Sequence, residues 1–589
     1  MVRLDENTLP GYWAVRHDAG MWIRDDHTVI CFTGSDAAQW LQTQTTNDVA
    51  SLESGQGHAG CLLDRKGRLH AHFTLHRWED QFWLIIQKAQ RARLSERLET
   101  YLFSDDVHIA DAGDEVDQLV IQGPRSLAFL ARLLDNAGQD SPPLPSDLHA
   151  CAPVHLLGCR VWAIRLSVTG EDGHVLLPER GEAERLRDAM LELGESFGIR
   201  EVPLAAREVL RVEAGIPWFG VDMNTDTRVS DTPLEQYAVS YTKGCYLGQE
   251  VVAKLKAHGS PRYAMVGLVF EQDKNELPEA ESDLIEDGER VGRIASSAFS
   301  PALDRPIALA YLDRQHRTPG QELRLGEPGD RAPLSARVQV LPFWEAPSRA
   351  DRARTLYDKA LERFQKDLDD RDHSPLELLE EAVLLDPGFE DAYETLGVIL
   401  NRQGRVDEAI ETMQRLVRLN PDCVMAHTNL SVFYVSKGMV REAEQEKAHA
   451  AMLQFKQTQD AKKAKEAAAA ERTRIEQQAQ DRIRMFKEVL ELDPGDVLAT
   501  YGLGIAHFQL EEYERAVPHL EKATGLKKDY SAAFLNLGKC HEFLKQTDRA
   551  REAYQAGIAA ASRKGDLMPM REMERRLNAL TAATKDSGQ

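Results

Sequence analysis

One segment in the first part of the chain alternates strictly between apolar and polar residues. Between residues 69 and 76, apolar side chains alternate with His70, His72, Thr74 and His76. This period of two predicts a β-strand with one buried face and one face toward solvent. A histidine face of this kind is also a possible metal site, with His70 and His72 as the ligands, but a solvated face is the commoner arrangement.

Other short apolar runs in the first 345 residues predict further strands with helices between them. The N-terminal strand candidates are residues 28–32 and 82–86, and the helix candidates are residues 35–44, with Ser35 as N-cap, and 92–101. Strands with intervening helices predict an α+β body. Valine-rich segments between Gly and Pro turns predict a small closing β-barrel, with strands at residues 266–270, 291–294, 307–312 and 336–341.

Beyond residue 347 the pattern is helical and repeats every 34 residues. Small and helix-ending residues recur at this spacing in pairs: Ala409 and Ala443, Ala516 and Ala550, Pro387 and Pro421. The period and the positions of the small residues are similar to those of tetratricopeptide repeats. Four repeats are clear, with a degenerate one before them and a weak one among them: 390–423, 424–457, 497–530 and 531–564, then 356–389 and 458–496. Such arrays stack into curved surfaces that bind peptides or proteins, so we expect a protein partner here.

The stretch from residue 439 to residue 493 contains neither glycine nor proline. Its middle is rich in Ala, Lys, Glu, Arg and Gln, which are strong helix formers. The composition is compatible with a helical hairpin and with one long projecting helix. A charged helix of this kind is usually a solvated face, and a partner-docking arm is the alternative.

Composition and charge narrow the classes of function. The 589 residues carry a formal net charge of −23, which disfavours direct binding to nucleic acid. No apolar run is long enough for a membrane span, and the N-terminal residues lack an apolar leader, so we expect a cytoplasmic protein. Seven scattered cysteines without a CxxC pair argue for a reducing compartment and against a metal centre closed by this chain alone.

The segment YTKGCYLGQEVVAK at residues 241–254 has the most chemical content. Lys243 is two residues from Cys245 and is expected to favour its thiolate by lowering the thiol pKa. Gly248 permits backbone geometry that other residues resist, and Gln249 with Glu250 offers an amide and a carboxylate. The alternative is a buried cysteine in a tight turn, with Glu250 beginning a helix.

The motif K-G-C-Y-x-G-Q-E resembles the signature of the YgfZ family of folate-binding proteins. That family belongs to the superfamily of the glycine-cleavage aminomethyltransferase, the T-protein. The resemblance extends over residues 10–345 and is carried by further segments: 34–37, 46–49, 62–68, 122–124, 169–173, 211–217, 233–235, 296–301 and 307–310. It predicts four parts of the chain: a folate-binding domain (1–262), a small β-barrel (263–345), a tetratricopeptide domain of five to six repeats (346–565), and a capping helix with a tail (566–589).

The resemblance implies an α+β T-protein-like fold of several subdomains around a folate pocket, followed by an all-α solenoid. It implies tetrahydrofolate and a transient iron–sulfur cluster as cofactors, and a role in iron–sulfur cluster assembly or repair. Such a role would indirectly support iron–sulfur enzymes, including those that modify tRNA. It implies catalytic roles for Cys245 and Lys243, and cofactor contacts from Arg211, Asn47, Glu171, Gln249 and Glu250. No resident metal site is predicted.

Departures from the T-protein pattern keep two alternatives open. Matching on Gly67 places Ala71 and His72 where T-proteins carry an acidic pair, one member of which is catalytic. Val175 stands where T-proteins have a glutamate that recognises the pterin. Folate-dependent aminomethyl transfer and a non-catalytic scaffold are therefore alternative hypotheses.

Arg211 also has an alternative interpretation. Instead of binding the anionic part of folate, it would form a structural salt bridge with a carboxylate such as Glu213 or Glu235. The glycines at 55, 57 and 60 form a G-x-G-x-x-G pattern. We expect a turn into a strand hairpin there and no dinucleotide site, because no helix is predicted to follow.

Overall fold

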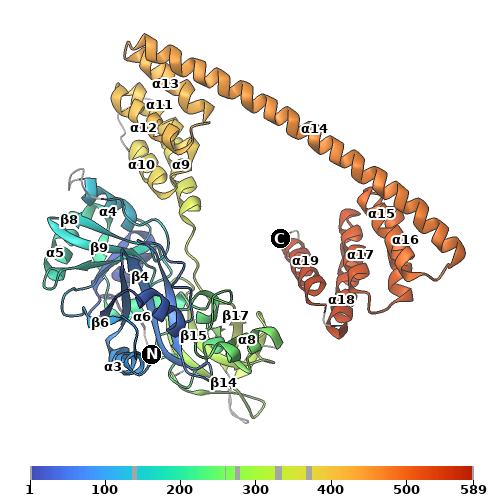
Figure 1. Ribbon diagram of the computed structural model, residues 1–589, viewed down its shortest axis with the longest axis horizontal. Helices are drawn as coiled ribbons and strands as arrows, with labels where there is room; N and C mark the ends of the chain where they lie inside the picture. Colours follow the sequence, from blue (N-terminus) through green and yellow to red (C-terminus); the bar gives the residue numbers. More distant parts are fainter. Residues whose placement is uncertain are drawn as a thin grey trace. The chain divides into compact units, whose positions relative to one another are not determined.

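The computed structural model describes residues 3–135, 142–258, 261–271, 279–325, 334–366, 374–564 and 566–586. It divides the chain into two compact units, Met1–Leu396 and Gly397–Gln589, which are treated separately below (Figure 1).

The first sheet of the first unit holds the histidine-bearing strand predicted from sequence. Its five strands are antiparallel in the order β3-β4-β5-β2-β6. They are β2 (His27–Thr33), β3 (Gly57–Leu63), β4 (Leu69–Trp78), β5 (Gln81–Gln87) and β6 (His108–Asp111), with helices α2 (Ala37–Gln44) and α3 (Lys88–Glu99). The apolar face of β4 packs with Trp40 and Leu41 of α2 in one core. The predicted hairpin after the glycines is confirmed, because β3 continues into β4.

Two details of this region differ from the predictions. The N-cap of α2 is Asp36, and Ser35 instead donates its hydroxyl proton to Asp106 over 2.9 Å. The polar face of β4 does not point to open solvent: His70 and His72 are partly buried, and His76 is 2% exposed with both ring nitrogens hydrogen-bonded. The reason is that β4 lies inside a multi-sheet unit, which covers both of its faces.

The second sheet has six strands in the order β11-β1-β7-β10-β9-β8. They are β1 (Ala19–Ile23), β7 (Leu119–Gln122), β8 (Cys151–Leu156), β9 (Cys159–Arg165), β10 (Gly173–Pro178) and β11 (Ile199–Glu201). Its helices are α1 (Leu9–His17), α4 (Ser126–Asp135), α5 (Ala183–Leu193), η1 (Glu195–Phe197) and α6 (Leu204–Glu213). Phe129, Leu186 and Met190 cover it within one buried cluster.

The third sheet is the predicted small barrel. Its order is β13-β14-β15-β12-β17-β16, and the edge strands β13 and β16 contact each other, so the sheet nearly closes. The strands are β12 (Tyr263–Phe270), β13 (Asp283–Glu286), β14 (Glu289–Ser300), β15 (Arg305–Asp313), β16 (Glu322–Leu325) and β17 (Leu334–Gln339). Short elements lead into it: η2 (Val229–Asp231), α7 (Leu234–Tyr237) and α8 (Gln249–His258).

The first helices of the repeat region belong to the first unit. They are α9 (Arg349–Lys366), α10 (Ser374–Leu385) and the beginning of α11 (Glu390–Arg402). Arg349 forms an ion pair with Asp172 across 2.5 Å, and α10 contacts α4. The repeat region therefore begins as a packed extension of the N-terminal domain.

The second unit is a series of helix pairs, as predicted. Its helices are α12 (Val406–Leu419), α13 (Val424–Ser436), α14 (Val440–Leu492), α15 (Val497–Gln509), α16 (Tyr513–Leu526), α17 (Ser531–Phe543), α18 (Thr547–Lys564) and α19 (Leu567–Asp586). The small residues at the 34-residue spacing permit close helix contacts. A Cβ atom on Gly504 would lie 2.8 Å from Leu520, and one on Gly538 would lie 2.2 Å from Tyr554.

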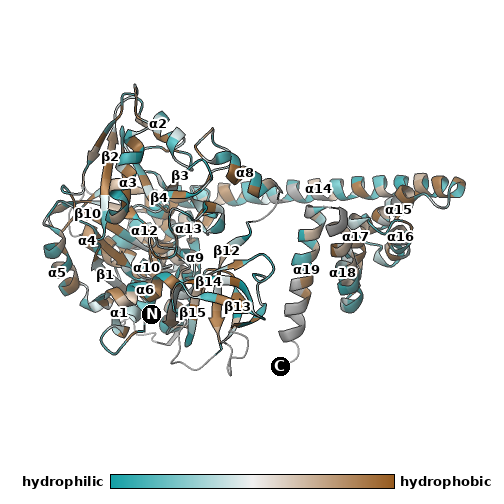
Figure 2. Ribbon diagram, turned by 90° about the horizontal axis from the view of Figure 1, so that it is seen from below, coloured by the Kyte–Doolittle hydropathy of each residue, from teal (hydrophilic) through white to brown (hydrophobic). Residues whose placement is uncertain are grey.

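The glycine-free stretch forms one helix. α14 is continuous for 53 residues, which corresponds to a length of about 80 Å. Of the two arrangements left open for this stretch, the structure has the single long helix, because no turn residue interrupts the strong helix formers there. Polar residues dominate its length in Figure 2. Among the described helices, none combines the length and apolarity that a membrane span requires.

Candidate functional site

The loop at residues 240–248 joins α7 to α8 and packs on the turn between β3 and β4. Gly248 has a φ of +86°, and a Cβ atom there would lie 2.5 Å from the carbonyl oxygen of Asp64 and 3.4 Å from Gly67. Only glycine combines this backbone conformation with this close approach. Two motifs noted in the sequence, the one at 62–68 and the one at 241–250, are thus in direct contact.

Lys243 is buried and fixes this loop to the end of α2. Its ammonium group donates to the carbonyl oxygens of Gln42, Thr45 and Asn47 over 2.6, 2.7 and 2.8 Å. These carbonyls lie at a helix C-terminus, where intrahelical donors run out and a cation is favoured. Burial lowers the pKa of Lys243 to about 8. All three ammonium protons are donated to backbone carbonyl oxygens. The geometry therefore favours a structural role for Lys243 over the predicted lowering of the Cys245 pKa.

We expect Lys243→Met to destabilise the first unit by about 3 kcal/mol. The substitution keeps the apolar stem but leaves three carbonyl oxygens, one buried and two partly buried, without their charged donor. Urea unfolding followed by tryptophan fluorescence measures the change. Lys254→Met is the matched control: Lys254 is exposed and bonded only to Glu250 on the same helix, so we expect a change within about 0.5 kcal/mol. Equal effects of the two substitutions would contradict the role assigned to Lys243.

Asn47 connects the same segments from the other side. Its side-chain nitrogen donates to the carbonyl oxygens of Ala59 over 2.9 Å and Tyr237 over 3.3 Å. Its backbone carbonyl oxygen accepts a hydrogen bond from the ammonium group of Lys243. Asn47 thus holds β3, α7 and the loop at 240–248 together, which is a positioning role.

Cys245 is exposed at the outer end of this loop. The seven cysteines lie in described parts of the chain, and all are free thiols. Cys245 is exposed, and the other six are buried or partly buried. The alternative of a buried cysteine is therefore wrong, while Glu250 does lie in the first turn of α8. Glu250 is exposed and bonded to Lys254, and Gln249 opens the same helix.

Arg211 lies in a separate buried network. Its guanidinium makes five hydrogen bonds, including 2.6 Å to Asp222, 2.9 Å to Glu208 and 3.1 Å to the hydroxyl of Ser296 in the barrel. Five bonds use all five N–H groups, so none is left for folate. This favours the structural alternative, but the partners are Asp222 and Glu208, which the sequence interpretation did not name.

Glu171 is also buried and already paired. It accepts hydrogen bonds from Arg16 over 3.0 Å and from the indole of Trp344 over 2.8 Å. Arg16 also bonds Glu213 over 2.5 Å, and Glu213 accepts the hydroxyl of Tyr12. The network ties α1, α6, the turn before β10 and the segment after the barrel. This favours a structural role for Glu171 over the predicted cofactor contact.

Further buried or partly buried histidines lie inside the first unit, and the sequence interpretation named only His72 among them. We use the name histidine cluster for His27, His58, His72 and His149, of which His58 lies on the opposite face of the first sheet from His72. Burial is the main cause that lowers the pKa of His27, His72 and His149 to about 4. Neighbouring histidines contribute for His72 and His149, and Arg24 contributes for His27. Burial also lowers the pKa of His58. These rings are therefore neutral near pH 7.

Three ring nitrogens of the histidine cluster have no hydrogen-bond partner among the described residues. They are Nε2 of His58, Nε2 of His72 and Nδ1 of His149. Buried polar atoms are normally paired, so such atoms indicate a place for water or a polar ligand. Tyr237 of α7 is 47% exposed as a residue, and burial raises the pKa of its hydroxyl.

The three positions at which the sequence departs from the T-protein pattern, residues 71, 72 and 175, lie in the strands of the first unit. Ala71 is buried in the sheet core, and His72 is its neighbour on the opposite face of β4. Val175 is fully buried in β10 within the core. No carboxylate stands at these three positions. Sequence reasoning missed His27, His58 and His149 because they come from separate loops and strands, and only their unusual number near β2–β4 would have signalled them.

Comparisons with known proteins match both halves of the chain. Residues 5–243 match the GCVT N-terminal domain, and residues 264–345 match the glycine cleavage T-protein C-terminal barrel domain. Tetratricopeptide repeat families match residues 376–430, 483–530 and 501–564.

Several relatives match more than half of this chain. An aminomethyltransferase of Streptomyces avermitilis is 30% identical over 339 residues, which is 56% of this chain and 88% of the relative. One of Corynebacterium aurimucosum is 29% identical over 351 residues, 58% of this chain and 90% of the relative. The crystal structure of glycine cleavage system aminomethyltransferase T from Bartonella henselae is 26% identical with a TM-score of 0.51, covering 57% of this chain and 90% of that one.

Proposed function

The chain belongs to the aminomethyltransferase family through its first 345 residues, and on that premise we propose that it is a tetrahydrofolate-binding accessory factor for iron–sulfur cluster assembly or repair. Its tetratricopeptide array recruits a protein partner of that process. The observation that carries the proposal is the exposed thiol of Cys245 on a loop anchored by Lys243, in a domain that lacks the acidic pair at residues 71 and 72.

The position of Cys245 suits contact with iron or sulfur held by another protein. A thiolate is the usual protein ligand of iron–sulfur clusters, and a four-ligand site needs more than one cysteine. The anchors at Lys243 and Gly248 hold the loop on both sides of the thiol. Cys245 therefore supplies one ligand, and a partner supplies the rest. The repeat array, a class of surface that binds proteins, provides the means to hold such a partner.

The interior of the first unit supports tetrahydrofolate as the small-molecule ligand. Nε2 of His72 and Nδ1 of His149, which have no partner among the described residues, offer hydrogen-bonding groups to a polar ring edge. Tetrahydrofolate, when bound, supplies a carrier for one-carbon units. Val175 removes the carboxylate contact to the pterin, so we assign its orientation to the histidine cluster and to Tyr237.

We expect Cys245→Ala to abolish support of iron–sulfur enzymes without unfolding the chain. The side chain is exposed, so its truncation is expected to change stability by about 0.5 kcal/mol or less. The measurement is the activity of iron–sulfur enzymes in extracts of cells whose own copy is replaced by the variant. Cys31→Ala, at a partly buried cysteine of the first sheet, is the matched control. Full activity with Cys245→Ala would overturn the proposal.

Aminomethyl transfer is a second candidate, favoured by one observation. His72 stands at a position of the missing acidic pair, and its Nε2 has no hydrogen-bond partner among the described residues. Release of ammonia with transfer of a one-carbon unit to tetrahydrofolate, lost in His72→Leu and kept in Cys245→Ala, would favour this candidate. Absence of this transfer in the wild-type chain would favour the accessory role.

A further inference from the structure

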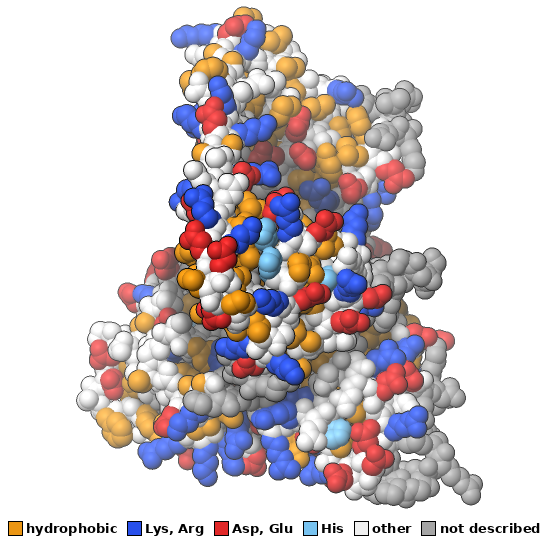
Figure 3. Space-filling view, turned by 90° about the vertical axis from the view of Figure 1, so that its right-hand side faces the viewer, with side chains coloured by type: hydrophobic (Ala, Val, Ile, Leu, Met, Phe, Trp, Pro, Cys, Tyr) orange, Lys and Arg blue, Asp and Glu red, His pale blue; other side chains and the backbone are white. Residues whose placement is uncertain are grey.

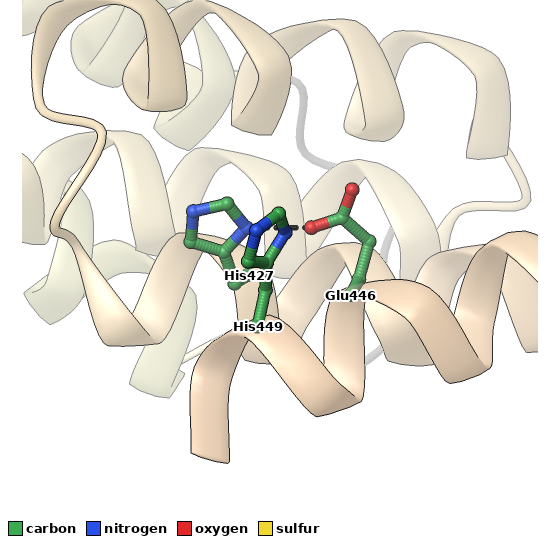
Figure 4. A group of neighbouring side chains, drawn as sticks. All are labelled: His427, Glu446 and His449. Atoms are coloured by element: carbon green, nitrogen blue, oxygen red, sulfur yellow. Dashed lines mark hydrogen bonds and ion pairs between the residues drawn. The ribbon is translucent and has the colours of Figure 1, made fainter. Parts of the chain in front are cut away.

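Three side chains at the root of the long helix form a ligand group outside the N-terminal domain. His427 comes from α13, and Glu446 and His449 come from α14 (Figure 4). One ligand atom from each lies within 4.8 Å of the other two. Nothing in the aminomethyltransferase relationship involves these residues, because the matched region ends at residue 345.

The local sequence explains this convergence. Glu446 and His449 are spaced i, i+3, so they lie on one face of α14 a single turn apart. α13 and α14 are the two helices of one repeat and pack against each other. His427 enters from α13 with 6% of its surface exposed, and its ring lies 5.3 Å from that of His449. Repeat packing thus brings three metal-binding side chains together at a helix–helix contact.

The hydrogen bonds of His427 indicate that a cation belongs there. Its Nε2 lies 3.2 Å from the carbonyl oxygen of Pro421, so this nitrogen carries a proton and donates it. Its Nδ1 lies 2.5 Å from a carboxylate oxygen of Glu446. In the neutral ring this Nδ1 has a lone pair, which would face an anionic oxygen. A positive charge is required between them: a proton fits the present 2.5 Å separation, and a metal ion takes its place when the two atoms move apart.

The geometry points to a zinc-class divalent metal site formed by Nδ1 of His427, a carboxylate oxygen of Glu446 and a ring nitrogen of His449. Two histidines with one glutamate form an established ligand set for Zn²⁺, with a fourth position left for water. Pro421 supplies the outer-shell acceptor that metal-bound histidines usually have on their second nitrogen. The partly buried setting and the mixed nitrogen and oxygen ligands exclude a hard-cation preference such as Ca²⁺.

Binding would draw the three ligands together and fasten two helices. Zinc ligands at about 2.0–2.1 Å from the metal are roughly 3.3 Å apart. Nδ1 of His427 and the Glu446 oxygen, now 2.5 Å apart, therefore move apart by side-chain rotation, while the more distant ligand atoms of the group come closer. The metal would then lock the first turns of α14 onto α13, at the base from which the 53-residue helix extends. We infer that the metal sets the stability of this end of the long helix.

Calorimetric titration of ZnCl₂ into the tag-free, chelator-treated full chain tests the site. We expect one Zn²⁺ per chain and a higher melting temperature of the helical signal when zinc is present. His449→Ala should weaken binding at least about tenfold, and Glu446→Gln should do the same. His519→Ala is the matched control, because His519 lies on a repeat helix, stacked on His507, outside the ligand group.

Circular dichroism measures the helix content of each variant and so distinguishes a loss of zinc ligands from unfolding. Glu446→Gln and His449→Ala replace partly exposed residues, so we expect unchanged helix content without metal. Absence of stoichiometric zinc binding to the wild-type chain would overturn the site and leave a proton between His427 and Glu446. Equal zinc affinity of the wild type and of both folded variants would also overturn it.

Discussion

Acidification from pH 7 to pH 5 is expected to destabilise the first unit by about 5 kcal/mol or more. Burial lowers the pKa of five histidines to about 3 or 4: His27, His72, His76, His149 and His174. The ordinary value in an unfolded chain is about 6.5. Each histidine contributes on the order of 1–2 kcal/mol at pH 5, and five together approach the whole stability of a typical domain.

The sign follows from which state binds protons first. As the pH falls below about 6.5, the unfolded chain takes up protons on these histidines while the folded chain does not, so unfolding becomes easier. The loss continues until the folded histidines titrate near pH 4. Asp231 acts in the opposite direction, because burial raises its pKa to about 6, but it is one group against five.

Tryptophan fluorescence isolates this effect. All eight tryptophans lie between residues 13 and 344, so the signal reports on the first unit within the full chain. We expect a much lower melting temperature at pH 5 than at pH 7. In His76→Gln the melting temperature is expected to fall less over the same pH range. His108→Gln, at an exposed histidine, is the control and should keep the wild-type profile. A melting temperature that does not change with pH would show that the buried histidines do not control stability.

Glu213→Gln is expected to destabilise the first unit by about 3–5 kcal/mol. Glu213 is fully buried and accepts from Arg16 over 2.5 Å and from the hydroxyl of Tyr12 over 2.8 Å. Burial alone would lower the pKa of Arg16, and the adjacent Glu213 outweighs it, so this pKa is raised. The amide removes the negative charge and places N–H groups against existing donors, which leaves a buried cation undercompensated.

A double substitution separates the ion pair from general disruption. Urea unfolding of Glu213→Gln, of Arg16→Met and of the pair together gives a coupling free energy. We expect the double variant to lose clearly less than the sum of the two single losses, since neither charge is then stranded. Glu201→Gln, at an exposed glutamate of β11, is the control. Strict additivity would contradict the direct pairing.

Local patterns predicted the elements well because each depends on neighbours in sequence. The period-two run became β4, and the 34-residue spacing became the helix pairs, with Gly504 and Gly538 at close helix contacts. The sequence did not decide between a helical hairpin and the single helix α14, because strong helix formers are compatible with both arrangements.

The site was harder to predict because its partners are distant in sequence. Lys243 resembled a thiol-tuning lysine from its spacing to Cys245, but its three acceptors lie almost 200 residues earlier. Arg211 pairs with Glu208, one turn earlier on α6, and with Asp222, which lies beyond the end of that helix where no periodicity reveals it. The histidine cluster likewise exists only after β2, β3 and β4 pair.

Net charge also says little about local surfaces. The chain carries −23 overall, yet the face in Figure 3 shows Lys and Arg side chains interspersed with Asp and Glu. A mixed surface of this kind favours specific polar contacts with a protein over a long-range pull on a polyanion.

Calorimetric titration of the full chain with tetrahydrofolate tests most directly whether the first unit keeps a folate site without acidic residues at positions 71, 72 and 175. We predict saturable binding of one tetrahydrofolate per chain, unchanged in Cys245→Ala and weakened about tenfold or more in His72→Leu, which removes one ring nitrogen from the histidine cluster. Absence of saturable binding, or equal affinity in His72→Leu, would contradict it.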